Sequence, residues 1–382
     1  MKLCVVAGEA SGDIHAAEVL AELARLDSDL SSFGIGGDRL AAAGMVILHH
    51  AREMGIVGLF NVLRHVPMFR RVFRELIERI RLEKPDAILL VDYPDFNLRV
   101  AREVRKLGIP VIYYISPQVW AWRKRRVRTI ARVVDHMLVI FPFEEPFYRE
   151  HGVPVTYVGH PLVEQLEEAI REPRAPAADG ILRVALMPGS RSMEVESLLP
   201  PMIDGVRILR RDRDVDAFVI RASTIPFAAL QRLIDSSGLS IRIVESDGRD
   251  ALAGADVSVS SSGTATLEAA VLGVPVVVVY KLSPATYLLA KLLVKLPYFS
   301  LVNIVAGKYV VPELLQDAVK GEAIARAVKE LVEPDRYRNV LRELALVRAA
   351  LGGKGASRRA AEKIATLVRD RNRAIPAERT RA

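Results

Sequence analysis

The feature that most constrains the fold is an alternation of short apolar runs with charged segments of helical period. In the first part of the chain the apolar runs are Leu3–Val6, Ala87–Val91, Val111–Ile115 and Met137–Phe141. Short apolar runs of this kind suit strands that are buried on both faces, and parallel strands need a helical crossover between them. The pattern therefore predicts βα units on a parallel sheet.

The alternation stops at residues 171–180, where Pro, Ala and Gly accumulate, and then starts again. The later apolar runs are Val184–Met187, Ala217–Ile220, Ile241–Val244, Val257–Ser260 and Val274–Val279. A chain of 382 residues with 51% hydrophobic content is long enough to bury two cores. We therefore expect an α/β fold of two Rossmann-like domains, residues 1–170 and 181–320, with parallel sheets facing across a cleft. A helical C-terminal tail, residues 321–382, should follow.

Charge and cysteine content narrow the classes of partner and compartment. The excess of 54 Lys and Arg over 46 Asp and Glu gives +8, which favours phosphate, anionic lipid or nucleic acid. Cys4 is the single cysteine, so no disulfide framework can form and a reducing cytoplasm is favoured. The most apolar segment, residues 284–299, carries Lys291 and Lys295 on one helical face, which indicates an amphipathic helix and not a membrane span. The amino terminus is too short in apolar residues for a signal peptide.

Two strand ends in the first domain carry polar groups. Gly8 and Gly12 flank a strand-to-helix turn with Glu9 and Ser11, where the backbone can approach an anion. The alternative is that these glycines only permit the turn while Asp13 caps the helix. His15, one turn later, could face the same site, although a lone histidine is more often structural.

The second strand end bears two carboxylates, Asp92 and Asp95, beside a proline that fixes the turn. A transferase that activates a sugar hydroxyl needs one carboxylate as general base. We take Asp95 as the candidate and Asp92 as the second choice. The competing interpretation is that Asp95 caps the following helix.

A basic run with two tryptophans follows the next strand. Trp120, Trp122, Arg123, Arg125 and Arg126 combine rings and cations in a way that suits a lipid headgroup layer. The apolar and arginine-rich residues 55–73 support the same interpretation. A solvated helix face, ordinary core packing and nucleic-acid binding are the alternatives, and we expect an anionic membrane surface and no nucleic acid as partner.

The second domain has two small-residue turns, each between a strand and a helix. Gly189 and Ser190 offer amides to a phosphate, and Arg191 can neutralise a leaving diphosphate. Later, Ser262, Gly263 and Thr264 lead into a helix that carries Glu268, which can accept both hydroxyls of a ribose. Neither turn is a P-loop, so ATP hydrolysis is disfavoured.

No metal site is expected from the sequence. Asp212 and Asp214 have the acid-x-acid form used by metal-dependent glycosyltransferases, but they lie between a helix and a strand and not at a strand's carboxyl end. The seven histidines show no metal-ligand spacing. We therefore expect neither a metal nor another cofactor.

Several motifs resemble the lipid-A-disaccharide synthase family. They are GEASGD, GIGGDRLAAAGM, DYPDFN, SPQVWAWR, VGHPL, MPGSR, SSGTATLE and FSLVNIVAG, spread in order from Gly8 to about Leu315. The resemblance implies a GT-B fold and transfer of 2,3-diacylglucosamine from UDP to 2,3-diacylglucosamine 1-phosphate. The products are a β-1,6-linked disaccharide 1-phosphate and UDP. It also implies a homodimer that exchanges C-terminal segments, and a location on the cytoplasmic face of the inner membrane.

The resemblance assigns roles to matching residues. It makes Asp95 the base, Arg191 the diphosphate partner, and Glu268 with Ser262–Thr264 the ribose and phosphate contacts. Asn303 falls in the asparagine-bearing loop near the nucleotide, and Glu9 and Ser11 line the opposite wall. The sequence departs from the family at Ile304 and Lys308, where leucine and arginine are common, and a lysine lacks the fork for a bidentate contact.

Two other classes of function stay open at this stage. One is a related enzyme that acts on UDP-N-acetylglucosamine, either an epimerase or a transferase that makes a cell-wall lipid. The other is a membrane-bound sensor of nucleotide sugars without catalysis, which would have no use for Asp95.

Overall fold

The computed structural model describes residues 1–54, 62–122, 124–172, 175–245, 248–283, 286–287 and 296–379. The side chains of residues 62–65, 122, 124 and 373–379 are also outside the description. The chain divides into two compact units. Unit 1 is Met1–Pro161 with Gly353–Ala382, and unit 2 is Leu162–Gly352.

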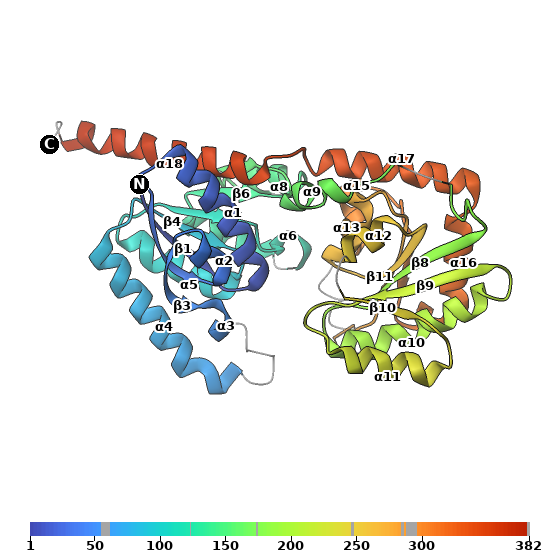
Figure 1. Ribbon diagram of the computed structural model, residues 1–382. Helices are drawn as coiled ribbons and strands as arrows, with labels where there is room; N and C mark the ends of the chain where they lie inside the picture. Colours follow the sequence, from blue (N-terminus) through green and yellow to red (C-terminus); the bar gives the residue numbers. More distant parts are fainter. Residues whose placement is uncertain are drawn as a thin grey trace. The chain divides into compact units, whose positions relative to one another are not determined.

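Unit 1 is built on a seven-stranded parallel sheet of order β3-β2-β1-β4-β5-β6-β7 (Figure 1). Its strands are β1 (Lys2–Ala7), β2 (Ser31–Gly36), β3 (Val46–His50), β4 (Ala87–Val91), β5 (Val111–Tyr114), β6 (His136–Val139) and β7 (Val155–Tyr157). Its helices are α1 (Ala10–Leu26), α2 (Asp38–Ala42), α3 (Ala51–Met54), α4 (Val62–Glu83), α5 (Pro94–Lys106), α6 (Val119–Trp122), η1 (Lys124–Arg126), α7 (Val127–Val133), α8 (Glu144–Glu150) and α18 (Ala356–Arg379). The four apolar runs expected in this part of the chain are β1, β4, β5 and β6.

The sequence pattern did not predict three strands of this sheet, β2, β3 and β7. The clearest reason lies in β2, whose sequence SSFGIG holds two glycines and reads as a turn. Gly34 is required there because a Cβ at this position would lie 1.9 Å from the carbonyl oxygen of Val5 on the neighbouring strand. The glycine therefore serves close strand approach at a register shift and not a chain reversal.

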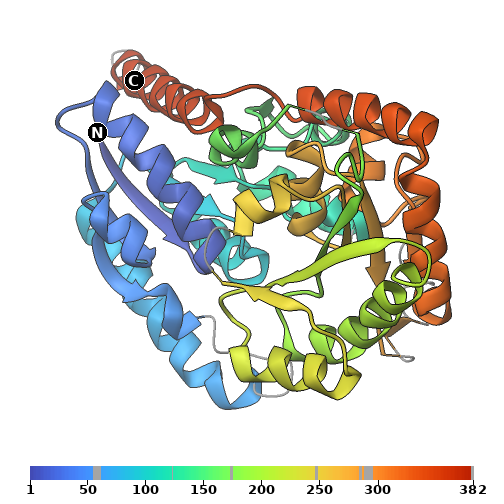
Figure 2. The same ribbon diagram turned by 45° about the vertical axis from the view of Figure 1, so that its right-hand side comes forward.

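Unit 2 repeats the architecture with a six-stranded sheet of order β10-β9-β8-β11-β12-β13. Its strands are β8 (Ile181–Met187), β9 (Asp214–Ile220), β10 (Arg242–Val244), β11 (Val257–Ser261), β12 (Val276–Tyr280) and β13 (Glu313–Leu315). Its helices are α9 (Pro161–Gln165, which begins at the boundary), η2 (Glu167–Ala169), α10 (Ser192–Leu209), α11 (Phe227–Ser237), α12 (Gly248–Ala253), α13 (Thr264–Val271), α15 (Leu301–Ala306), η3 (Gln316–Ala318), α16 (Gly321–Leu331) and α17 (Pro334–Ala350). Helix α10 packs between α16 and α11 (Figure 2).

Each sheet has one position where the strand order reverses. In unit 1 it lies between β1 and β4, whose last residues Ala7 and Val91 are register partners. In unit 2 it lies between β8 and β11, where Met187 pairs with Ser260. The loops after such strands leave toward opposite faces of the sheet and open a crevice at the carboxyl ends, which is the usual ligand site of open α/β sheets.

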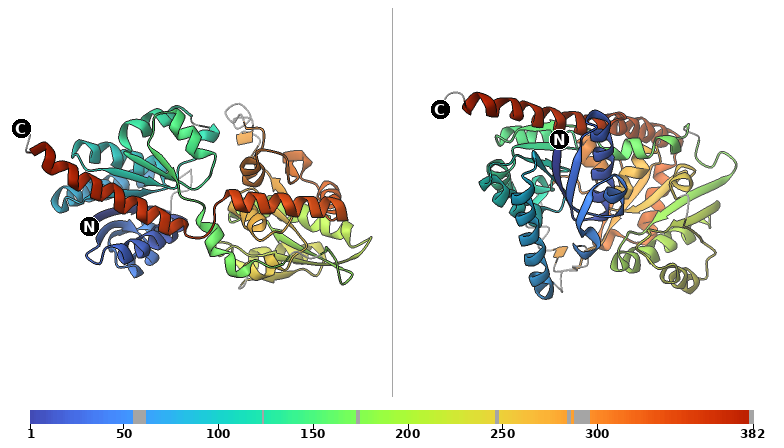
Figure 3. Two further views of the ribbon diagram at one scale, coloured as in Figure 1. Left: turned by 90° about the horizontal axis from the view of Figure 1, so that it is seen from above. Right: turned by 60° about the vertical axis from the view of Figure 1, so that its left-hand side comes forward.

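The C-terminal region is helical, as expected, but it is shared between the units. Helices α16 and α17 pack on α10, α13 and α15 in unit 2, whereas α18 lies beside α1 in unit 1 (Figure 3). The buried face of α18 includes Ala360, Ala361 and Ile364. The division after Pro161 and again after Gly352 differs from the expected bounds because the chain returns to unit 1 through this apolar face.

Among the described residues, no helix has the length and hydropathy to cross a membrane. The amphipathic helix expected at 284–299 falls mostly outside the described residues, as do residues 55–61 of the apolar, arginine-rich segment.

Candidate functional site

The switch point of unit 2 holds a pocket of about 520 Å³. It is formed by the loops that follow β8, β9 and β11. The pocket brings together seven of the residues singled out from sequence, namely Gly189, Ser190, Arg191, Ser262, Gly263, Thr264 and Glu268. Two turns 70 residues apart in the chain therefore contribute to one hollow, because their strands are neighbours in the sheet.

One wall of the pocket is the N-terminus of α10. Gly189 has φ +117°, and a Cβ there would lie 2.4 Å from Oε2 of Glu194. Glu194 accepts a hydrogen bond from the Ser190 amide at 3.3 Å and one from Nη1 of Arg191 at 2.8 Å. Glu194, the third residue of α10, thus holds the turn before the helix against its first turn. The Arg191 side chain is 78% exposed, so its guanidinium is accessible to a ligand.

The other wall is the N-terminus of α13. Gly263 has φ +153°, and the space where a Cβ would stand is open for 4 Å. Ser262 donates through Oγ to the carbonyl of Phe299 at 3.2 Å, which holds the turn in place. Glu268 lies one turn into the helix, where burial raises the pKa of its carboxyl while Arg249 opposes the shift. This wall offers helix amides and a carboxylate, the groups that a phosphate and a ribose require.

The pocket also includes residues that the sequence argument missed. Arg221 and Ser223 enter from the loop after β9. Arg221 pairs with Glu245 at 2.7 Å and donates to the carbonyl of Ile225 at 2.7 Å. No glycine motif marks this loop, so only the position of β9 beside β8 could have pointed to it.

Asn303 corrects an expectation. Its side chain is fully buried, and Nδ2 donates to the carbonyl of Val311 at 2.9 Å and to Oε1 of Glu313 at 2.8 Å. Oδ1 accepts from the amides of Val310 and Val311 at 2.7 and 3.0 Å. Every donor and acceptor of the amide is therefore used inside unit 2. Asn303 braces the turn before β13 and has no hydrogen-bonding capacity left for a nucleotide.

Two other polar side chains of unit 2 are engaged away from the pocket. Lys308 is 56% exposed and pairs with Glu343 at 2.8 Å. Asp212 pairs with Lys329, in keeping with its place between a helix and a strand. Within the part of the chain that the structure describes, no group of three or more His, Cys, Asp or Glu side chains is placed to hold a metal ion.

At the switch point of unit 1, Asp92 lies in a partly buried position. It directly follows β4 with φ 45°, a left-handed conformation that is strained for most residues. Nδ2 of Asn97 donates to the Asp92 carbonyl at 2.8 Å and to that of Val91 at 3.1 Å, and the hydroxyl of Tyr113 donates to the Asp92 carbonyl too. The backbone is thereby held while the carboxyl stays partly buried. Burial, assisted by the charge of Glu9, raises the pKa of Asp92 to about 6.

Asp95 lies in a different environment. It belongs to the first turn of α5, its side chain is 75% exposed, and Oδ1 is 2.5 Å from Nη2 of Arg126. Tyr93, not Asp95, occupies the N-cap position of this helix. The two candidate carboxylates therefore differ in environment: Asp92 is partly buried, and Asp95 is exposed beside Arg126.

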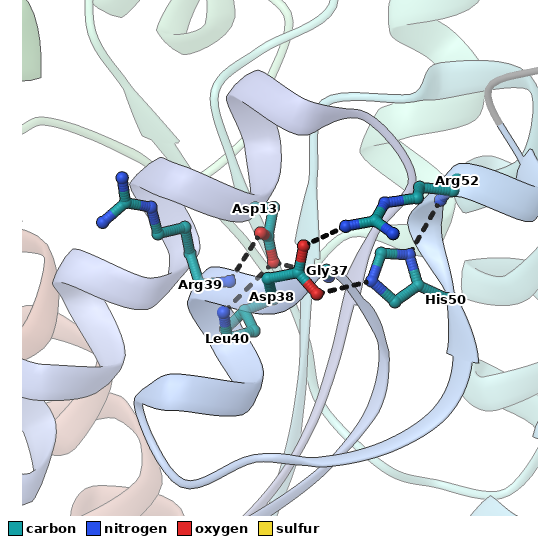
Figure 4. Close-up of polar contacts among 7 residues, drawn as sticks. All are labelled: Asp13, Gly37, Asp38, Arg39, Leu40, His50 and Arg52. Carbon is teal, nitrogen blue, oxygen red and sulfur yellow. Dashed lines mark hydrogen bonds and ion pairs between the residues drawn. The ribbon is translucent and has the colours of Figure 1, made fainter.

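Asp13 has a structural task that the sequence argument placed on the wrong helix. Its buried carboxylate accepts hydrogen bonds from the amides of Gly37, Arg39 and Leu40 at 2.6, 3.0 and 3.2 Å (Figure 4). It therefore caps α2 and not its own helix α1. A Cβ on Gly37 would lie 2.6 Å from Asp13 Oδ2, so glycine is needed for this approach.

The remaining polar residues of this region surround the turn after β1. Glu9 and Ser11 are exposed at the start of α1, and Nδ1 of His15 is 3.8 Å from Glu18. His160, a residue with no distinguishing spacing in the sequence, is buried against the ring of Phe141. Burial lowers the pKa of His160 to about 3, so its ring is neutral at physiological pH.

Trp120 corrects a second expectation. Its side chain is 7% exposed, Nε1 donates to Oε1 of Glu144 at 3.1 Å, and its ring packs edge-on against Phe143 at 4.8 Å. Glu144 is itself buried, and burial raises its pKa to about 7. Trp120 therefore anchors α6 to the core of unit 1 and does not face lipid.

Arg125 and Arg126, which follow Trp120 in the chain, are less buried than Trp120 itself. Arg125 is exposed, and Arg126 is the partner of Asp95. Arg123 and the side chain of Trp122 lie outside the described residues.

The neighbouring helices α5 and α7 pack together and carry further exposed arginines, Arg99, Arg102, Arg128 and Arg132. We call these four the α5–α7 basic surface. None of the four has an ion-pair partner among the described residues.

Known proteins resemble this chain over almost its whole length. The family model described as lipid-A-disaccharide synthetase matches residues 3–366. The lipid-A-disaccharide synthase of Myxococcus xanthus is 44% identical over 374 residues, covering 96% of this chain and 97% of the relative. That of Geobacter sulfurreducens is 42% identical over 366 residues, covering 94% and 95%.

Solved structures show the same fold at low identity. A UDP-N-acetylglucosamine 2-epimerase from Listeria monocytogenes, described as putative, has a TM-score of 0.67 at 14% identity and covers 97% of each chain. MurG of Acinetobacter baumannii has a TM-score of 0.61 at 15% identity, covering 96% of this chain and 99% of its own. These similarities establish a GT-B arrangement of two Rossmann-like domains.

The environment of Asp92 leads to a prediction about stability. A carboxyl whose pKa is raised from 3.8 to about 6 on folding destabilises the native state once the unfolded chain ionises. That cost is absent below pH 3.8, grows between pH 3.8 and 6, and is complete above pH 6. Asp92→Asn should therefore raise the melting temperature at pH 8 and change it little at pH 3.5, about the lower limit of the titration. Asparagine also tolerates the left-handed backbone.

Thermal melts at the two pH values test this, with Asp95→Asn as the matched control in the same turn. The control should not show the gain at pH 8, because its side chain is exposed. A lower melting temperature for Asp92→Asn at pH 8 would mean that burial of the ionised Asp92 carboxyl does not destabilise the native state.

Proposed function

The chain belongs to the lipid-A-disaccharide synthetase family, and we propose that it transfers 2,3-diacylglucosamine from UDP to the 6-hydroxyl of 2,3-diacylglucosamine 1-phosphate. The observation that carries this proposal is the pocket at the unit 2 switch point, where two helix N-termini, an arginine and a carboxylate converge. These are the groups that a nucleoside diphosphate sugar needs.

In the proposed donor complex the uridine ribose hydroxyls donate to the carboxylate of Glu268. The diphosphate accepts from the amides at the start of α13, and Arg191 balances its charge. As the bond between the sugar C1 and the UDP oxygen breaks, negative charge builds on that oxygen. Arg191 and the helix amides stabilise this charge in the transition state.

The acceptor reaction needs a base, and we assign that role to Asp92 of unit 1. The 6-hydroxyl oxygen forms its bond to C1 of the donor sugar from the side opposite UDP, which inverts the anomeric centre, and its proton passes to the Asp92 carboxylate. A pKa of about 6 leaves Asp92 ionised at neutral pH yet more basic than an ordinary aspartate. We further assign Glu9 and Ser11, exposed at the start of α1, to acceptor binding.

The function is tested by incubating the protein with UDP-diacylglucosamine, with and without diacylglucosamine 1-phosphate, and measuring UDP. Release only with the acylated acceptor supports the synthase. Release without acceptor would indicate hydrolysis or epimerase-like chemistry, and no release from either mixture would overturn the proposal.

The assignment of the base is tested with a matched pair of variants. Asp92→Asn should lower turnover by roughly 10²–10⁴-fold, the usual contribution of a positioned base, while UDP binding is retained. Asp95→Asn should keep most of its activity, since only an exposed pair with Arg126 is lost. In the native enzyme the rate should fall below about pH 6 as Asp92 takes up its proton. A reversed order of the two variants would return the role to Asp95.

The nucleotide assignment is tested at Glu268. Glu268→Ala should weaken UDP binding by roughly 1.5–3 kcal/mol, the value of charge-assisted hydrogen bonds, without loss of fold. Glu330→Ala is the control, because this exposed glutamate lies on α16 and does not line the pocket. Calorimetry with UDP measures both. Equal affinity of the two variants would place the ribose elsewhere.

We also propose that unit 1 binds anionic membranes through the α5–α7 basic surface and Arg125, which would bring the enzyme to its lipid substrates. Each cation near such a surface contributes about 1 kcal/mol, and salt screens it. Reversing Arg99, Arg102 and Arg128 to glutamate should abolish binding to vesicles that contain anionic lipid.

The matched control reverses three exposed arginines of unit 2, Arg211, Arg213 and Arg326, and carries the same change of net charge. Cosedimentation at low and high salt measures the binding. Equal loss in both variants would show that net charge, and not this surface, directs the protein to the membrane.

A further inference from the structure

Unit 2 contains a second hollow, of about 610 Å³, between α10 and α11. We call it the α10–α11 groove. Its apolar lining comes from Val195 on α10 and from Ile225, Pro226, Ala229 and Leu233 on or before α11. Val195 and Ile225 are each 2% exposed, so the floor of the groove is part of the domain core.

The groove adjoins the candidate nucleotide pocket. The loop after β9 lines both hollows, and it is tied to the loop after β8 where Oγ1 of Thr224 donates to the carbonyl of Ser190 at 2.6 Å. Two consecutive residues just after this contact line different hollows: Arg191 lines the candidate nucleotide pocket, and Ser192 lines the groove.

Two large apolar side chains next in sequence to residues of the groove are exposed to solvent. Met193 follows the lining residue Ser192 and is 77% exposed, and Phe227 follows Pro226 and is 44% exposed. Exposed apolar side chains next to an apolar hollow and a substrate pocket indicate a surface that an apolar ligand covers. The sides of the groove are polar, with Ser192, Glu196, Arg232 and Ser236. An acyl group has the matching pattern, because its carbonyl accepts hydrogen bonds and its tail is apolar.

We propose that the α10–α11 groove binds one acyl chain of the donor diacylglucosamine. This inference rests on the proposed function, since UDP in the neighbouring pocket would fix the sugar whose acyl chain enters the groove. The chain packs on Ala229 and Leu233, with Met193 and Phe227 closing over it, while Arg232 or a serine donates to the acyl carbonyl. The groove then sets how strongly the enzyme depends on donor chain length.

The test fills the groove. Ala229→Trp should raise the KM for a long-chain donor by roughly tenfold or more, since each methylene lost from apolar contact costs about fourfold in binding. The effect should shrink as the donor acyl chains are shortened, and UDP affinity should stay unchanged. Ala228→Trp is the matched control, because Ala228 is exposed on the same helix and does not line the groove.

A second variant guards against misfolding of the first. Leu233→Ser adds no bulk and should weaken the dependence of KM on chain length. Unchanged chain-length dependence in both variants, while the native enzyme turns over the acylated donor, would overturn the groove assignment alone. A native enzyme that releases no UDP from acylated donor would instead overturn the proposed function. A change of oligomeric state with an unchanged KM would assign the groove to a second copy of the chain and reject the acyl chain.

Discussion

The structure depends on where its parallel sheets reverse their order. Strands β1 and β4 are neighbours in one sheet and β8 and β11 in the other, yet the loops that follow each pair run to helices on opposite faces. The first backbone amides of the helices that follow these loops have no partner within their own helix, so the carboxyl ends of the central strands present polar groups beside an otherwise apolar layer. The candidate residues of both units stand at these four strand ends and on the loop after β9. The topology of the sheets thus determines where the candidate residues lie, and their side chains determine which groups are available there.

Two carboxylates near the unit 1 switch point show how the same group serves different ends. Asp13 is buried but accepts three backbone hydrogen bonds, so its charge is compensated and it holds α2 in place. Asp92 is partly buried with Glu9 nearby, and its pKa rises as a result. The protein holds it there through hydrogen bonds to its backbone carbonyl, while a hydrogen bond from the Tyr93 amide to the carboxyl opposes part of the pKa rise. Strain at Asp92 is therefore sustained by the surrounding structure, as is typical of functional sites.

Much of this could be predicted from the sequence, and the failures have physical causes. Apolar runs located the strands that form the middle of each sheet, and the family motifs located the turns of the nucleotide pocket. Burial of polar and aromatic side chains was not predictable, because Trp120 and Asn303 owe their roles to partners such as Glu144 and Glu313. For the same reason the strand-end position could not decide between Asp95 and Asp92, because that choice depends on which of the two carboxylates the fold buries.

The two helix N-termini of the nucleotide pocket are not equivalent. The start of α10 is already occupied by the carboxylate of Glu194, which takes the Ser190 amide and pairs with Arg191. The start of α13 has no acidic residue in its first turn, and the space beside Gly263 is open. A diphosphate would meet like charge at α10 and uncompensated amides at α13, so the helix dipole favours α13 as its seat. Arg191 would then act from the opposite wall as an exposed cation that is paired with Glu194. The diphosphate and the ribose would then be held by one helix, because Glu268 lies one turn further along α13.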